Sequence, residues 1–219
     1  MIINFAICRR ALRENLPSAA VSCLVLACVS SGAHADRVVL APTGSTLTEL
    51  SIKSELMISS TAGTDRSWFT YASSDGIELE LNRLESPAER KKQWSANLEY
   101  PLPTLQNLPA ISVGIRDMTG TGAEHGAFYL AASRNVPLSS LQHRFLRSAE
   151  ISLGAGTGPI GGGYIGLSSR LRTGLQLSAE VFERRPNFSA GLPVMKGLQL
   201  KAYSLNGHLF YGASYHFAR

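Results

Sequence analysis

Cysteine is nearly absent from this chain, and its absence excludes several classes of protein. Only three of the 219 residues are cysteine, and all lie within the first 28 positions (Cys8, Cys23 and Cys28). The rest of the sequence therefore offers neither a disulfide framework nor a cysteine-based zinc site. The histidines, His34, His125, His143, His208 and His216, are scattered without acidic partners at a metal-ligand spacing. We expect no metal and no other cofactor.

Long hydrophobic runs are also lacking. The most apolar stretch, residues 19–29, is too short for a membrane-spanning helix, which needs about 20 residues. It follows the basic residues Arg9, Arg10 and Arg13 and precedes an Ala-x-Ala site that ends at Ala35. This order is typical of a cleavable secretory signal peptide. We therefore expect a signal peptide at residues 1–35 and one domain at residues 36–219.

A second cleavage site competes with the first. Val25-Leu26-Ala27-Cys28 resembles a weak lipobox, in which Cys28 would be lipidated and become the new N-terminus. Leu26 is unusual at its position in such a motif. The cut after Ala35 is the preferred interpretation, and lipidation at Cys28 stays open.

Charge is modest. The whole chain has a formal net charge of +5, of which residues 1–35 contribute three Arg and one Glu, a net of +2, so the remainder carries +3. No basic patch interleaved with aromatic residues is present, and we expect no nucleic-acid partner.

A helical period of 3.6 residues is missing after residue 36, and short alternating segments take its place. Turn residues such as Asp75-Gly76 and Asn206-Gly207 separate them and are typical of hairpins. Twelve strands are expected, at residues 50–58, 67–73, 77–82, 93–100, 110–119, 126–135, 149–155, 163–171, 175–183, 187–194, 198–205 and 208–217. The prediction is an all-β fold, an antiparallel up-and-down transmembrane β-barrel of about 12 strands, with 10 or 14 remaining possible.

The last strand carries the clearest membrane pattern. One face holds Leu209, Tyr211, Ala213, Tyr215 and Phe217, and the other holds His208, Phe210, Gly212, Ser214 and His216. An apolar stripe that ends in aromatics indicates a lipid-facing surface. The spacing of Gly212, Tyr215 and Phe217 is similar to the assembly signal of outer-membrane barrels, although two residues follow it. We expect a porin-like protein in the outer membrane of a Gram-negative bacterium, with outer-membrane lipid and the barrel assembly machinery as partners.

Charged residues in the strands predict a polar lumen. A cation on the lipid face at mid-bilayer costs roughly 2–4 kcal/mol and an acid less, so Glu78, Glu80 and Glu99 should face inward. We expect lumenal cations to pair with Glu55, Glu80, Glu99 and Glu180. The candidate lumen-facing residues are Lys53, Glu80, Glu99, Arg116, Arg170, Glu180 and Lys201.

Three segments interrupt the strand rhythm. Residues 136–147 predict a loop with a short helix at the end of the barrel that carries the chain termini. The Gly-rich residues 154–163 lack the Lys-Ser/Thr ending of a nucleotide-binding loop and predict a bend between strands. Asp117 would face lipid in a regular strand, so we expect the strand to have emerged into water at this point.

Part of the centre of the chain resembles a known family. Residues 108–122, with a Gly-x-x-Asp-x-x-Gly-Thr-Gly pattern, precede a Tyr-Leu-x-Ala-Ser-Arg run, and together they resemble the signature of YjbH-like outer-membrane proteins associated with exopolysaccharide biosynthesis. The residues that match are Gly114, Asp117, Gly120, Gly122, Tyr129, Ser133 and Arg134. The resemblance implies a non-catalytic role in exopolysaccharide biosynthesis or export, as conduit or accessory, with polysaccharide secretion components as partners.

Two other functions fit parts of the sequence. His208, Ser214 and His216 share one face of the last strand and would be the candidates in a lipid-modifying barrel enzyme. Residues two apart on a strand lie about 7 Å apart, however, so no catalytic residues are assigned. A soluble periplasmic β-sandwich that binds a partner explains the alternation too, but not its outward aromatics.

Overall fold

The computed structural model describes residues 37–47, 49–60, 65–86, 91–103, 108–121 and 126–218. The proposed signal peptide, Ala35, Cys28 and the motif residue Gly122 lie outside the described residues. The described strands are β1 (Ser51–Ser59), β2 (Asp65–Ala72), β3 (Glu78–Ser86), β4 (Lys91–Leu102), β5 (Ala110–Arg116), β6 (Ala127–Asn135), β7 (Leu146–Gly156), β8 (Tyr164–Leu171), β9 (Gln176–Phe182), β10 (Arg185–Met195), β11 (Leu198–Leu205) and β12 (His208–Ala218).

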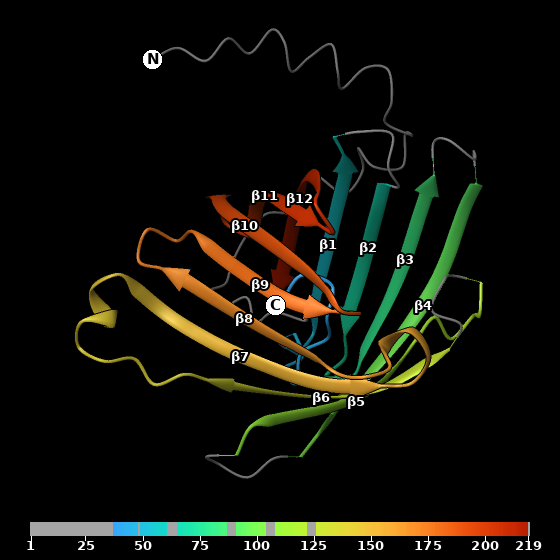
Figure 1. Cartoon of the computed structure of the whole chain (residues 1–219), viewed down its shortest axis with the longest axis horizontal. Helices are drawn as coiled ribbons and strands as arrows, with labels where there is room; N and C mark the ends of the chain where they lie inside the picture. Colours follow the sequence, from blue (N-terminus) through green and yellow to red (C-terminus); the bar gives the residue numbers. More distant parts are fainter. Residues whose placement is uncertain are drawn as a thin grey trace, which may run out of the picture.

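These strands form one closed antiparallel barrel. Each strand pairs with its neighbours in sequence, and β1 pairs with β12 to close the sheet, with Ser51 opposite Ala218 and Ser59 opposite Phe210. Figure 1 shows β1–β4 along one wall and β7–β10 along another. The predicted all-β up-and-down barrel of about 12 strands is confirmed, and the β-sandwich alternative is wrong because the sheet closes on itself.

Side chains alternate between the lumen and the exterior, as the two-residue period of a strand requires. In β1 the side chains of Ser51, Glu55 and Met57 are buried, whereas Ile52 and Leu56 are exposed. Every strand exposes large apolar residues on its outer face. The buried faces carry charged groups such as Glu55 and Glu180 beside apolar ones such as Trp68, so the exterior is unlike that of a soluble protein.

The exterior forms an apolar belt, which we define as the outward-facing large hydrophobic residues of the strands. Every one of the twelve strands contributes at least one such residue with more than a third of its surface exposed. Its members include Ile52, Leu56, Phe69, Tyr71, Leu79, Leu81, Trp94, Leu98, Tyr100, Val113, Phe128, Leu130, Ile151, Leu153, Ile165, Leu167, Leu177, Val181, Phe188, Leu192, Leu200, Leu209 and Tyr211. Within the described residues, no helix is long and apolar enough to cross a membrane.

The two ends of the barrel differ. We call the end at which β1 starts and β12 finishes the terminal end, and the opposite one the far end. Toward the far end, two apolar clusters fill the lumen. One contains Met57, Trp68, Tyr203, Leu205 and Phe210, and the other Ala127, Tyr129, Ala131, Ile160, Tyr164 and Phe182.

The connections agree with the expected ones, and the strands beside two of them differ in their bounds. Residues 136–145 link β6 to β7 at the terminal end and contain a short 3₁₀ turn at Gln142–Arg144, but β7 already begins at Leu146, earlier than expected. The Gly-rich stretch is a connection, with a 3₁₀ turn whose Ile160 is buried. β5 ends at Arg116 instead of residue 119, because Asp117 takes a positive φ of 53°.

The seam between β1 and β12 explains the glycine in the proposed assembly signal. A Cβ added to Gly212 would lie 2.0 Å from the backbone oxygen of Leu56 on β1. No real Cβ tolerates such a distance, so closure at this register requires glycine. The other two residues of the signal, Tyr215 and Phe217, are partly exposed and belong to the outward face.

Candidate functional site in the barrel lumen

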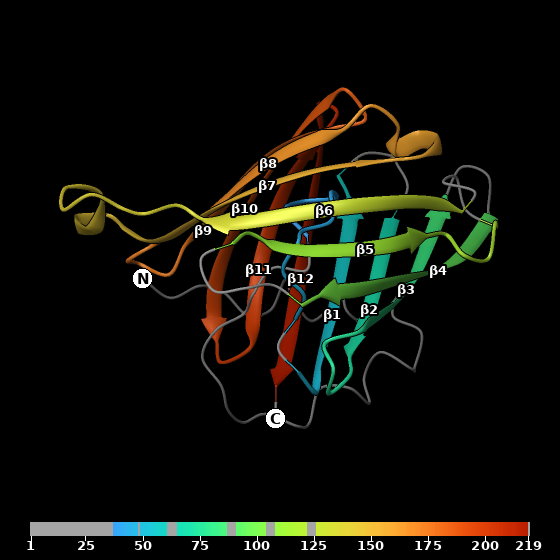
Figure 2. The ribbon, with the colours of Figure 1, turned by 90° about the horizontal axis from the view of Figure 1, so that it is seen from below.

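The lumen contains a segment of the chain itself. Residues 37–47, which we call the inner segment, precede β1 and turn back inside the barrel, where Figures 1 and 2 show them enclosed by the strands. The Val38 N–H donates to the Ala41 carbonyl at 3.0 Å, and Arg37 and Pro42 form an antiparallel bridge. Val38, Val39 and Ala41 pack into the two apolar clusters.

One carboxylate holds the turn of the inner segment. Glu180 on β9 accepts hydrogen bonds from the backbone N–H groups of Val39 (2.9 Å), Leu40 (3.0 Å) and Ala41 (2.9 Å). The side-chain amide of Asn187 donates to Oε1 of Glu180 at 2.8 Å, the oxygen that also accepts from Leu40. Because charge-assisted hydrogen bonds are roughly twice as strong as neutral ones, Glu180 is the principal anchor of this turn.

The returning half of the segment is bound to a different wall. The Ser112 hydroxyl on β5 donates to the Thr43 carbonyl, and the Gly44 N–H donates to the Ser133 hydroxyl on β6, both at 2.8 Å. A Cβ on Gly44 would lie 2.2 Å from the Ala110 carbonyl oxygen, so only glycine fits against β5. The inner segment therefore contacts both sides of the lumen.

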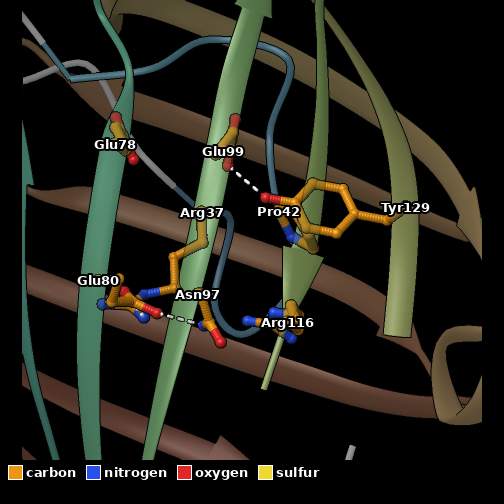
Figure 3. A pocket seen from close by; sticks show the side chains of 8 residues that line it. All are labelled: Arg37, Pro42, Glu78, Glu80, Asn97, Glu99, Arg116 and Tyr129. Atoms are coloured by element: carbon orange, nitrogen blue, oxygen red, sulfur yellow. Dashed lines mark hydrogen bonds and ion pairs between the residues drawn. The ribbon is translucent and has the colours of Figure 1, made fainter. Parts of the chain in front are cut away.

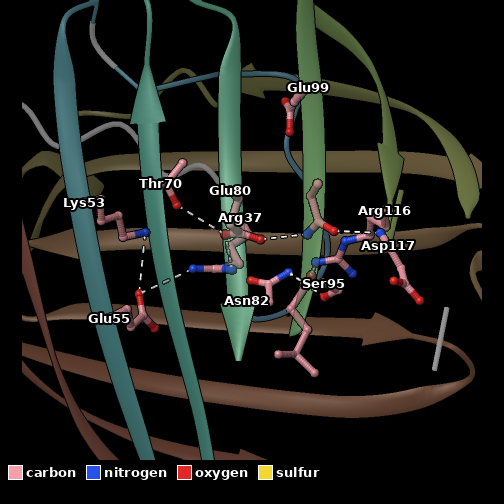
Figure 4. Close-up of polar contacts among 12 residues, drawn as sticks. Arg37, Lys53, Glu55, Thr70, Glu80, Asn82, Ser95, Glu99, Arg116 and Asp117 are labelled. Atoms are coloured by element: carbon pink, nitrogen blue, oxygen red, sulfur yellow. Dashed lines mark hydrogen bonds and ion pairs between the residues drawn. The ribbon is translucent and has the colours of Figure 1, made fainter. Parts of the chain in front are cut away.

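Arg37 organises the central polar cluster. Its guanidinium donates to Glu80 at 2.5 Å, lies 3.9 Å from Glu55 and covers the Trp68 ring at 4.4 Å from the centroid. Asn97 also donates to Glu80, at 2.8 Å (Figure 3). Figure 4 shows the Arg37 side chain with both of its carboxylate partners, Glu80 and Glu55. Removal of one partner from a salt bridge buried in this way strongly destabilises the protein, because the other charge is left buried without compensation.

A second polar group lies beside it. The Tyr129 hydroxyl on β6 donates to Glu99 at 2.7 Å, across the small space shown in Figure 3. That space has a volume of about 20 Å³, room for about one water molecule. Gly114 makes the contact possible, because a Cβ there would lie 2.4 Å from the Tyr129 ring.

The structure directs the candidate lumen-facing residues inward and brings several of them together. Lys201 and Lys53 lie 3.0 Å and 3.6 Å from Glu55, and the Tyr203 hydroxyl donates to the same carboxylate at 2.5 Å. The expected pairing of Arg170 and Glu180 with opposite charges is wrong. Glu180 binds backbone N–H groups, and no described carboxylate lies within 4.0 Å of Arg170.

The other expected lumenal cation contacts the inner segment. Arg116 donates to the Leu40 carbonyl at 2.7 Å and lies over the Phe182 ring. It therefore supports the same turn that Glu180 anchors, but from β5.

The residues that carry the family resemblance occupy three environments. Tyr129 and Ser133 point into the lumen, where Tyr129 contacts Glu99 and Ser133 contacts the inner segment. Gly114 lies against the Tyr129 ring on the same face. Asp117 is buried at the far end and accepts from Thr119, and Gly120 occupies a turn with a φ of 65°. Arg134 is exposed near the end of β6. They form no single cleft.

A larger cavity opens on the terminal side of the inner segment. It has a volume of about 440 Å³ and is lined by the strand ends of β1 and β7–β12, together with Arg37, Val38 and Leu47. Its charged lining is entirely basic. We call it the basic vestibule, lined by Lys53, Arg147, Arg170, Lys196, Lys201 and His216 besides the inner segment.

Sequence reasoning missed the inner segment and Arg147. The apolar run Val38-Val39-Leu40-Ala41, next to the proposed cut, was a signal for a buried segment outside the strands. Arg147 has no such signal, because it enters the cavity lining through an irregularity in the β7–β8 register between Leu146 and Ser148.

No catalytic or metal-binding arrangement emerges among the described residues. They contain no group of three or more metal-ligand side chains. His208 and His216 start and nearly finish β12, so they are about 27 Å apart at the rise of a strand.

Comparisons with known proteins complete the description. No protein-family model and no curated protein matches the sequence. Among solved structures, a triple mutant of the Rhodopseudomonas blastica porin matches with 10% identity over 71% of this chain and 56% of that chain, at a TM-score of 0.35. A second mutant of the same porin matches with 10% identity and a TM-score of 0.33, over the same shares. This chain thus spans little more than half the length of those porins, and TM-scores of this size support no inference about function.

Proposed function

We propose that this chain is a non-catalytic outer-membrane β-barrel that serves as an accessory protein in exopolysaccharide biosynthesis or export. The observation that carries the membrane location is the apolar belt. A continuous ring of exposed Leu, Ile, Val, Phe, Tyr and Trp around all twelve strands would be strongly unfavourable in water. In a bilayer it faces hydrocarbon, and the closed sheet leaves no edge unsatisfied.

The residues at 1–35 fit the same location. The basic head, apolar run and Ala-x-Ala site would export the chain through the inner membrane. Assembly into the outer membrane would then use the barrel machinery, with Gly212, Tyr215 and Phe217 as the recognition signal.

The occupied lumen favours an accessory over an open conduit. The inner segment lies in the lumen together with two apolar clusters, and its contacts reach β3, β5, β6 and β9. A polymer could pass only if the segment moved out. The link to exopolysaccharide rests on the resemblance carried by residues 108–134.

Two measurements test this proposal in order. Electrophoresis of the detergent-extracted outer-membrane fraction, with and without boiling, should show a heat-dependent mobility shift, because a closed barrel resists detergent until heated. A deletion strain should then secrete less exopolysaccharide, and the wild-type gene should restore it. Unchanged secretion would reject the exopolysaccharide role, and release by osmotic shock without a heat shift would reject the membrane location.

A further inference from the structure

The basic vestibule differs in chemistry from the rest of the lumen. Around Arg37 the lumenal cations face carboxylates, such as Glu80 at 2.5 Å. The vestibule collects lysine and arginine from β1, β7, β8, the β10–β11 turn and β11, and none of the described residues that line it is acidic. Lys53 and Lys201 also approach Glu55, at 3.6 Å and 3.0 Å, so the difference in chemistry is carried by Arg147 and Arg170. Its lining includes residues at the terminal ends of β1, β7, β8 and β12, and the inner segment contributes only Arg37, Val38 and Leu47 to it.

Arg147 and Arg170 form the most unusual pair in this cavity. β7 and β8 pair with Ser148 opposite Arg170, and the register shifts between Leu146 and Ser148, so Arg147 is the extra residue of a bulge. Bulges commonly re-aim a side chain at a functional position. The two like charges interact unfavourably, and neither has a carboxylate within 4.0 Å in the described part of the chain. An anion between them would relieve that repulsion.

Neutral hydrogen-bonding side chains lie next to Arg170 on the adjoining strands of the barrel. The β-sheet register places Gln176 opposite Arg170, Gly191 opposite Gln176 and Lys201 opposite Gly191. The Gln199 amide donates to Gln176 at 3.3 Å and lies over Gly191, where a Cβ would come within 2.8 Å of the Gln199 side chain. Amides beside cations suit a ligand that has hydroxyl groups as well as negative charge. The volume of about 440 Å³ is within the range of small-molecule sites, roughly 300–1,000 Å³.

We propose that the basic vestibule binds an acidic oligosaccharide segment, with a sugar carboxylate between Arg147 and Arg170 and sugar hydroxyls against Gln176 and Gln199. Arginine pairs with carboxylates through charge-assisted, often bidentate, hydrogen bonds. This inference deepens the proposed function, because it identifies the polymer as an anionic one. Only the identity of the natural ligand rests on the proposed function; the binding site itself does not.

Calorimetric titration of the purified full-length barrel in detergent tests the site, with hexagalacturonate as the acidic probe. Maltohexaose is the uncharged oligosaccharide for comparison, and inorganic phosphate is the small anion. The double variant Arg147→Gln/Arg170→Gln should weaken hexagalacturonate binding about tenfold or more, because it removes two charge-assisted contacts. Arg184→Gln/Arg185→Gln is the matched control. It removes the same charge from exposed positions at the far end, in the β9–β10 turn and at the first residue of β10, and should leave the affinity unchanged within about twofold.

The outcomes separate the alternatives. Maltohexaose should not bind. Equal loss of affinity in both double variants would mean that hexagalacturonate is attracted by the overall charge, and it would overturn the proposed site. Phosphate binding without any preference for hexagalacturonate would overturn the assignment of a sugar ligand. Lys196→Gln, on the β10–β11 turn outside any strand, gives a second test that does not touch the sheet and should also weaken binding. If the barrel binds hexagalacturonate but the deletion strain secretes exopolysaccharide normally, the site stands and the proposed function is rejected.

Discussion

Glu180 shows how one buried carboxylate can fix a piece of backbone that has no regular structure. It receives N–H groups from three consecutive residues, Val39, Leu40 and Ala41, in a part of the lumen where water cannot replace them. Buried donors that lose their acceptor keep the full cost of desolvation. Arg116, on β5, satisfies the Leu40 carbonyl.

Glu180→Gln should loosen the inner segment. The neutral amide offers one oxygen and an NH₂ group to a set of donors, which leaves at least one N–H unsatisfied at a cost of about 1–3 kcal/mol. We expect transient opening in planar bilayers, seen as current fluctuations absent from the wild type. Glu85→Gln, a half-exposed carboxylate paired with Arg83 and Lys92, is the control and should stay silent. Identical records for the two variants would mean that the carboxylate does not hold the segment.

Gly114 illustrates a packing constraint at the same scale. An added methyl group would meet the Tyr129 ring at 2.4 Å and the Leu98 carbonyl oxygen at 2.7 Å, and the latter belongs to backbone that cannot rotate away. Gly114→Ala should therefore destabilise the barrel by about 1–3 kcal/mol. The readout is the temperature at which the unboiled electrophoretic form disappears. Ser54→Ala on the exposed face of β1 should not change it, and a Gly114→Ala barrel as heat-resistant as the wild type would contradict the expected clash.

At the scale of elements, the barrel and the inner segment depend on different interactions. The twelve strands satisfy one another through a continuous ladder that closes between β1 and β12. The inner segment makes hydrogen bonds and apolar contacts with side chains inside the barrel, but it contributes no strand to the ladder. The strands should therefore pair without it.

Deletion of residues 37–47 should leave a closed barrel with an open lumen. We expect the heat-dependent mobility shift to persist, because every strand pair remains, and single-channel recordings to show stable conductance steps that the full chain lacks. Loss of the mobility shift would mean that the segment is required for assembly. A retained shift without conductance would mean that the side chains of the two apolar clusters close the barrel unaided.

At the scale of the whole molecule, an even number of strands places both ends of the barrel sequence at one face. β1 starts and β12 finishes at the terminal end, and the basic vestibule opens there. In a bacterial outer membrane that face would be periplasmic, so the vestibule would meet ligands before they leave the cell. The far end, filled by the apolar clusters, would face outward.

Cysteine labelling tests this orientation, because the natural cysteines all precede the domain. Ser60→Cys follows β1 at the far end, and Ser140→Cys lies in the β6–β7 connection at the terminal end; both serines are exposed. A membrane-impermeant maleimide should label the Ser60→Cys protein on intact cells, and the Ser140→Cys protein only after the outer membrane is permeabilised. The reverse pattern would invert the barrel and place the vestibule outside the cell.

The sequence alone determined the barrel, because the alternation of side chains and the turn residues are local properties that each segment carries independently. The inward direction of Lys53, Glu80, Glu99 and Lys201 followed from the same period. Only the tertiary structure decided the contents of the lumen. The inner segment has no period to reveal it, and its anchors Glu180, Ser112 and Ser133 are distant in sequence. The position of Arg147 in the same cavity as Arg170 likewise depends on a bulge between two strands, which no single strand encodes.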